Sequence, residues 1–118
     1  MESNQQQKKE LQPRFKNGTI SLTPTVRELL TYDEIGKYFL RHAQGYWGEW
    51  DDKKAIELNE RSLKDHKWKD FVVSKFNHQS DRQVTYFTMF HHNYTLVFFW
   101  DELALVVMRQ FLPAKTDL

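Results

Sequence analysis

The hydrophobic pattern of this chain changes its period once, near Trp68, and no other feature constrains the fold as strongly. Before this point apolar residues recur at helical spacing, as Ile35 and Phe39 do. After it the chain is rich in β-branched and aromatic residues, which favour strands. A chain with helices followed by strands is expected to fold as an α+β protein, with its helices packed on one face of a sheet.

Three helices are predicted in the first half of the chain. The first follows Thr23 and Pro24, because threonine is a good N-cap and proline suits the first helical position. The second runs from about Tyr32 to Gln44, begins with a capping box and ends at a glycine. The third is expected from Asp51 to Lys64, with Leu58 on its inward face.

Five strands are predicted, one before the helices and four after them. They cover residues 19–22, 71–76, 84–90, 94–100 and 105–111. The breaks between the last four are short and polar, which favours tight reversals. The expected fold is therefore an antiparallel sheet of about five strands in β-α-α-α-β-β-β-β order, with the helices on one face.

The length of 118 residues fits a single domain. Residues 1–14 are polar and rich in glutamine, so we expect a flexible arm there and one α+β domain over 15–118. The absence of cysteine excludes disulfides and thiolate chemistry. The first residues form no apolar signal segment, and no stretch approaches the roughly 18 apolar residues of a membrane span. We therefore expect a cytoplasmic protein that does not contact a membrane.

The formal charge of +1, from 17 basic and 16 acidic residues, argues against a protein that binds nucleic acid mainly by charge. A nucleic-acid-binding accessory protein stays open as an alternative. It would use Lys75 and Arg82 with exposed strand aromatics as stacking platforms. It would also use a basic cluster in the leading segment, formed by Lys8, Lys9, Arg14 and Lys16.

Three histidines in the strand region supply the one enzyme hypothesis, a His-dependent ribonuclease. His78 would have to converge with His91 or His92, and Arg82 or Lys75 would hold the phosphate. The histidine spacing matches no metal-site pattern, and no other catalytic motif is complete. We expect these histidines to be turn residues, and the protein to carry neither a metal nor a cofactor.

The segment from Arg41 to Trp50 contains two tryptophans, two glycines and a histidine where the second helix ends. His42 lies on the inward stripe of that helix, which is typical of a core histidine bonded to its surroundings. We expect Trp47 to be locked against the sheet. Trp50 is expected to point outward, where a tryptophan is a good interface residue.

This segment carries the pattern R-H-x-x-G-x-W-G, which resembles a motif of small uncharacterised "plasmid-related" proteins of bacterial mobile elements. The Thr23-Pro24 pair, Asn59 and the Phe111-Leu112-Pro113 ending also resemble that family. Tyr46 stands where the family usually has an aspartate, so a role for that carboxylate does not carry over. The family has no established activity, and the resemblance implies a fold and a mobile-element setting.

Both faces of the predicted strands are apolar. In the strand over residues 84–90, Tyr86 and Phe90 face one way, while Phe87 and Met89 face the other. Helices on one side of the sheet leave the second aromatic face uncovered. An apolar area of this size favours association with another molecule.

These features favour a small binding protein over an enzyme. We expect a cofactor-free protein from a phage or plasmid that acts on a host or defence protein, with a homodimer as one form. The interaction candidates lie in the turn and on the aromatic strand that follows; they are His42, Tyr46, Trp47, Trp50, Phe98 and Trp100.

Overall fold

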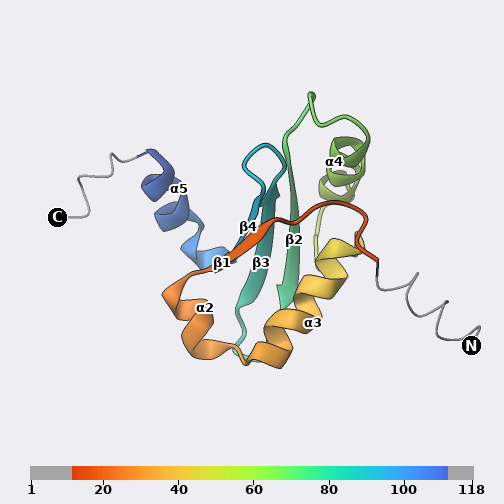
Figure 1. The fold of residues 1–118 in the computed structure, drawn as a ribbon. Coiled ribbons are helices and arrows are strands. Elements are labelled where there is room, and N and C mark those ends of the chain that lie inside the picture. Colours follow the sequence, from red (N-terminus) through yellow and green to blue (C-terminus); the bar gives the residue numbers. More distant parts are fainter. Residues whose placement is uncertain (1–11, 112–118) are drawn as a thin grey trace, which may run out of the picture.

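The computed structural model describes residues 12–111, and their side chains as far as Met108, as an α+β fold (Figure 1). The helices are α2 (Pro24–Leu29), α3 (Tyr32–Ala43), α4 (Lys53–Lys64) and α5 (Leu103–Phe111), with a 3-10 turn, η1, at Trp100–Glu102. The strands are β1 (Thr19–Leu22), β2 (Phe71–Asn77), β3 (Gln83–Met89) and β4 (Tyr94–Phe99). The α+β class expected from the sequence is therefore confirmed.

The sheet has four strands in the order β1-β4-β3-β2 and is mixed. The pairs β2–β3 and β3–β4 are antiparallel, as the short reversals predict, whereas β1 runs parallel to β4. The prediction of a wholly antiparallel sheet of about five strands was wrong in this respect. Because β3 occupies one side of β4, the first strand takes its other side, and the intervening helices carry the chain away from that edge.

The fifth predicted strand, at residues 105–111, is helix α5. Leucine, alanine, methionine, arginine and glutamine all favour helices, and only Val106, Val107 and Phe111 supported a strand. Glu102 fixes the start of the helical segment, because its Oε1 accepts from the backbone N–H of Phe99 at 2.9 Å and from Thr23 Oγ1 at 2.9 Å. The expected reversal after β4 is thus a helical turn that leads directly into α5.

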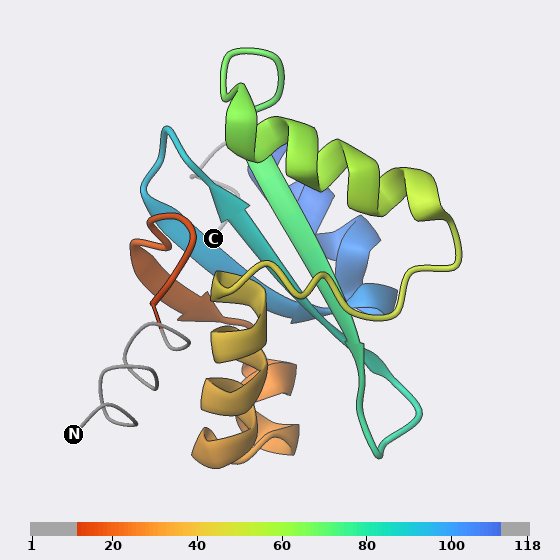
Figure 2. The ribbon, with the colours of Figure 1, turned by 90° about the vertical axis from the view of Figure 1, so that its right-hand side faces the viewer.

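The helices do not all lie on one side of the sheet. Figure 2 shows α3 and α4 in front of the sheet and α5 behind it. The front face carries the main core, where buried Val26 and Leu30 meet the strands. Tyr86 is fully buried there, and its hydroxyl donates to the carbonyl of Ile35 at 2.5 Å. We call the side that faces α5 the second face.

The predicted helix starts are confirmed. Thr31 and Glu34 form the expected capping box, with 3.1 Å from Glu34 N to Thr31 Oγ1 and 2.9 Å from Thr31 N to Glu34 Oε1. The inward face of α4 differs from the prediction, because Leu58 is 41% exposed while Asn59 and Ser62 are buried. The helix turns a polar side chain toward the sheet because β2 has backbone groups there that need partners.

Candidate functional site

His42 is enclosed by the protein and has no exposed surface. Its Nδ1 lies 2.5 Å from Ser74 Oγ on β2, and its Nε2 lies 2.7 Å from Thr88 Oγ1 on β3. Burial lowers the pKa of His42 to about 3, so the ring is neutral near pH 7. The hydrogen bonds continue from Thr88 to Thr95 Oγ1 at 2.6 Å and from there to the carbonyl of Asn17 at 2.8 Å. His42 therefore joins α3 to three strands.

Trp47 is buried as predicted, with 4% of its surface exposed. Its Nε1 donates to Glu60 Oε2 at 2.8 Å, so the turn is bonded to α4. The guanidinium of Arg14 donates to both oxygens of the same carboxylate at 2.9 Å. These bonds, led by the one from Arg14, hold the pKa of Glu60 below its usual value. Trp47 thus has a structural role and is not available to a partner.

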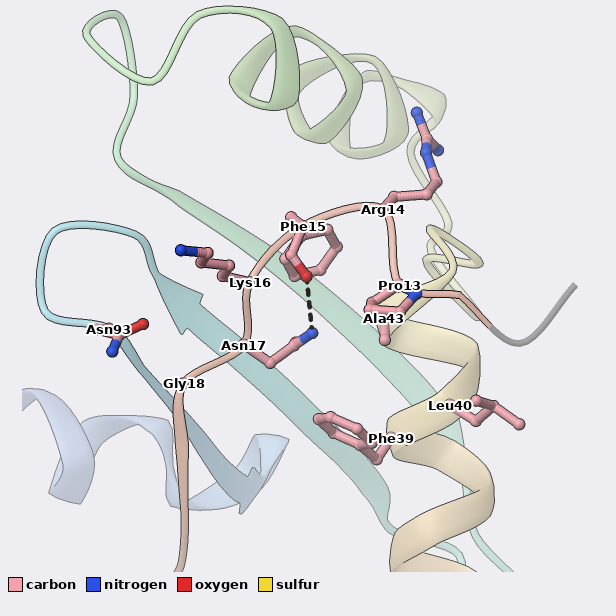
Figure 3. Close-up of a pocket in the computed structure, with 10 residues that line it drawn as sticks. All are labelled: Pro13, Arg14, Phe15, Lys16, Asn17, Gly18, Phe39, Leu40, Ala43 and Asn93. Carbon is pink, nitrogen blue, oxygen red and sulfur yellow. Dashed lines mark hydrogen bonds between the residues drawn. The ribbon is translucent and has the colours of Figure 1, made fainter. Parts of the chain in front are cut away.

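Residues 13–18, which we call the strap, cross over the end of α3 (Figure 3). Arg14 N donates to the carbonyl of Ala43 at 2.7 Å, and Asn17 Nδ2 donates to the carbonyl of Phe15 at 3.2 Å. The Phe15 ring packs edge-on against His42 at 5.2 Å and is stacked with Trp47 at 6.0 Å. A cavity of about 590 Å³ remains between the strap and α3. Arg14, placed in the arm by composition, is part of this bonded segment.

The turn that carries the R-H-x-x-G-x-W-G pattern closes the outer edge of the sheet at β2. Lys75 N donates to the carbonyl of Trp47 at 3.1 Å, and Glu49 N donates to the carbonyl of Lys75 at 2.6 Å. Asn59 makes the same pair of bonds with Val73, at 2.7 Å and 3.1 Å. Further along the strand, the Tyr38 hydroxyl donates to the carbonyl of Asn77 at 3.1 Å. Three successive outward positions of β2 are therefore bonded.

Trp50 leaves the turn toward the second face of the sheet. Its ring meets Trp100 edge to face at 5.7 Å, and Lys75 Nζ lies 4.5 Å and 4.8 Å from the two ring centres. Trp50 Nε1 is buried and has no hydrogen-bond partner among the described residues. Phe98 is also enclosed on this face, with 2% exposure. Trp50, which we expected to point outward, and Trp100 are thus in contact and half-buried, while Phe98 is buried on the same face.

Tyr46 projects from the turn, with 65% of its surface exposed. It lies on the rim of a groove of about 750 Å³ between α3 and α4, which Lys37, Arg41 and Ile56 also line. The groove mixes charged and apolar side chains. This groove is distinct from the cavity beside the strap, and it does not lie on the second face of the sheet.

The histidines of the enzyme hypothesis are not brought together. His78 lies in the turn between β2 and β3, and His91 and His92 lie in the turn between β3 and β4, at the opposite end of β3. His78 Nε2 contacts Glu34 at 3.0 Å, while His91 Nδ1 contacts Asp70 at 2.6 Å. Residues 12–111 contain no group of three side chains suited to hold a metal. The arrangement that a ribonuclease of this kind requires is not formed.

The basic residues of the nucleic-acid hypothesis are largely engaged within the protein. Arg82 forms two bonds with Asp101, at 2.6 Å and 2.8 Å, and Lys75 lies between the two tryptophans with 8% exposure. Arg14 is paired with Glu60. Lys8 and Lys9 lie outside the described residues. None of the described helices has the length and apolar composition to cross a membrane.

A largely apolar groove of about 380 Å³ runs between α5 and the second face of the sheet. Its floor is formed by strand residues and its wall by α5; the lining side chains are Phe71, Phe87, Met89, Tyr94, Leu96, Phe98, Leu103, Val106 and Val107. None of these side chains carries a charge. Sequence reasoning found the aromatic floor from strand alternation but missed the wall, because it assigned that segment to a strand.

No protein-family model, curated protein or solved structure matches this chain. The resemblance to plasmid-related proteins therefore stays a proposal.

Proposed function

We propose that this chain is a small, non-enzymatic protein-binding protein whose groove on the second face receives an apolar helix of a protein partner. The observation that carries this proposal is the uncharged lining of the groove between α5 and the sheet. Contiguous apolar surface of this kind is costly to leave in water and marks sites of protein interaction.

The size of the second face argues for a helix as the occupant. The four strands of the sheet span roughly 19 Å at about 4.8 Å per strand, whereas a helix with its side chains is about 10 Å wide. Helix α5 therefore leaves a strip of the face uncovered. A second helix beside it, with apolar side chains directed at the sheet, would complete a helical layer.

The side chains at the rim of the groove indicate that the partner's helix would contact it with apolar residues. On α5, Leu105 is 64% exposed and Met108 is 56% exposed, so apolar surface continues from the groove onto the helix wall. Residues 103–108 contain no charged side chain that could select an oppositely charged partner. The setting that accompanies this proposal is a phage or plasmid protein acting on a host or defence protein, for which the support is the resemblance of the R-H-x-x-G-x-W-G segment to plasmid-related proteins.

A charge placed in the wall of the groove tests the proposal. Val107→Glu changes a groove-lining residue that is 43% exposed, and Leu29→Glu is a matched control with the same exposure on α2. We expect a partner captured from host lysate by the wild type to bind Val107→Glu at least about tenfold more weakly in a direct titration. Leu29→Glu is expected to bind normally. Equal affinity for wild type and Val107→Glu would contradict the assignment of the groove.

A further inference from the structure

The two edges of the sheet differ in their hydrogen bonding to the rest of the described chain. The outer edge of β2 is bonded by Asn59, the Trp47–Glu49 turn and the Tyr38 hydroxyl. No described residue forms a corresponding bond at the outer edge of β1. An open strand edge is a template for pairing with another chain, and proteins usually protect it with charges or a covering segment.

The parallel pairing with β4 identifies which backbone groups of β1 face outward. Thr19 N donates to the carbonyl of Asn93 at 3.1 Å, and Thr23 N donates to the carbonyl of Val97 at 3.1 Å. Since bonding alternates along a strand, the N–H and C=O groups of Ile20 and Leu22 point away from the sheet. No hydrogen bond from a described residue outside the sheet reaches either backbone.

The side chains of β1 do not protect this edge. Its sequence, Thr-Ile-Ser-Leu, carries no charge and no proline. Thr19, Ile20 and Ser21 are all exposed, and Ile20 is exposed by 40% although it is a large apolar residue. Among the described residues, this edge therefore combines outward backbone groups that receive no bond from another segment with uncharged side chains, of which Thr19 and Ile20 are of strand-forming type.

We propose that β1 pairs with β1 of a second copy of this chain in an antiparallel, two-fold symmetric arrangement. The register that uses all outward groups places Ile20 opposite Leu22 of the other copy, which gives four backbone hydrogen bonds. Ser21 then lies opposite its own symmetry mate in the non-bonded position. This dimer leaves the groove on the second face free, so it does not depend on the proposed function.

A second copy fits this edge better than an unrelated strand, because pairing of two copies leaves no open strand edge among the described residues of the dimer. Two-fold pairing uses the same surface on both copies and forms an eight-stranded sheet. Its two outer edges would both be β2, which are already bonded along Val73, Lys75 and Asn77. The assembly therefore stops at two copies, and the uncharged β1 segments meet without like-charge repulsion.

A single cysteine tests the register directly, because the chain contains none of its own. Residues opposite each other in a non-bonded antiparallel pair have Cα atoms about 4.5 Å apart, within the range of a disulfide. We expect Ser21→Cys to form a disulfide-linked dimer rapidly under mild oxidation. Tyr32→Cys, at an 88% exposed position on α3, is the control and should remain largely unlinked. Equal rates of linkage for the two variants would overturn the register.

The dimer itself is tested by light scattering over a wide range of protein concentration. Ile20→Pro removes an outward N–H without removing a bond to β4, and proline is tolerated at such edge positions. We expect the wild type to be a dimer, and Ile20→Pro to be a monomer with the wild-type circular dichroism spectrum. A wild type that stays monomeric at every concentration, or a dimer that persists in Ile20→Pro, overturns the inference. Val107→Glu should remain dimeric, which separates this result from failure of the groove proposal.

Discussion

His42 is a buried side chain with a structural role, bonded to two strands of the sheet. Its position on the inward stripe of α3 predicted a core histidine, and this is confirmed by its complete burial. The partners Ser74 and Thr88 could not be predicted, because they lie 32 and 46 residues away on two different strands. Periodicity reports which face a residue occupies, but it does not report what that face meets.

The depressed pKa of His42 predicts acid sensitivity. The unfolded chain takes up a proton on this ring near pH 6.5, whereas the folded protein does so only near pH 3. The stability due to neutral His42 is therefore complete above pH 6.5 and is lost as the pH falls toward 3, by up to about 1.4 kcal/mol per pH unit. Urea unfolding at pH 7.5 and pH 5 should show this loss for the wild type but not for His42→Gln. Parallel pH profiles for the two proteins would contradict the prediction.

At the scale of elements, local sequence signals predicted helices and hairpins well and the sheet edge poorly. The capping box of α3 and the antiparallel pairs of β2, β3 and β4 follow from residues that are close in sequence. Helix α5 was missed because Val106, Val107 and Phe111 outweighed their helix-forming neighbours. The parallel pairing of β1 with β4 could not be predicted, since it joins the two ends of the described chain and no local pattern records it.

Alanine is expected to have opposite effects at Gly48, which contacts β2, and at Gly36, which lies in α3. A side chain on Gly48, which has a φ of +86°, would place Cβ 2.0 Å from the carbonyl oxygen of Lys75. We expect Gly48→Ala to lower the free energy of unfolding by about 2 kcal/mol or more, since it combines backbone strain with loss of the edge bonds. Gly36→Ala is the matched control, because nothing lies within 4 Å of that Cβ in α3. It should stabilise the protein by about 0.5–1 kcal/mol in the same denaturant experiment.

At the scale of the whole molecule, the strap connects parts of the fold that are distant in sequence. Phe15 contacts His42, Trp47 and the ring of Phe90, 5.8 Å away, so one side chain joins α3, the turn and the end of β3. Composition alone assigned the start of this segment to a flexible arm. The segment is polar, but Phe15 packs against residues of α3, the turn and the end of β3, and the Asn17 carbonyl accepts a bond from Thr95 on β4. These partners come together only when the sheet has formed.

The strap predicts a large stability effect from a residue near the start of the chain. We expect Phe15→Ala to lower the free energy of unfolding by about 2–3 kcal/mol. The variant loses three aromatic contacts and exposes His42, with its hydrogen bonds to Ser74 and Thr88, to water. Lys16→Ala, at an exposed position next to it, should change stability by less than about 0.5 kcal/mol. Thermal unfolding of the two variants beside the wild type measures both. Similar melting temperatures for all three proteins would mean that the strap contributes little.

The parallel pairing of β1 with β4 also sets the order in which the protein is completed during synthesis. The strap and β1 leave the ribosome before β4, and the Asn17 carbonyl receives its bond from Thr95, 78 residues later in the chain. The strap and β1 must therefore wait for β4, while α3 and the β2–β3 hairpin are already outside. Until β4 emerges, the growing chain exposes the edge of β3 as well as β1, and this interval is when a chaperone would be needed most.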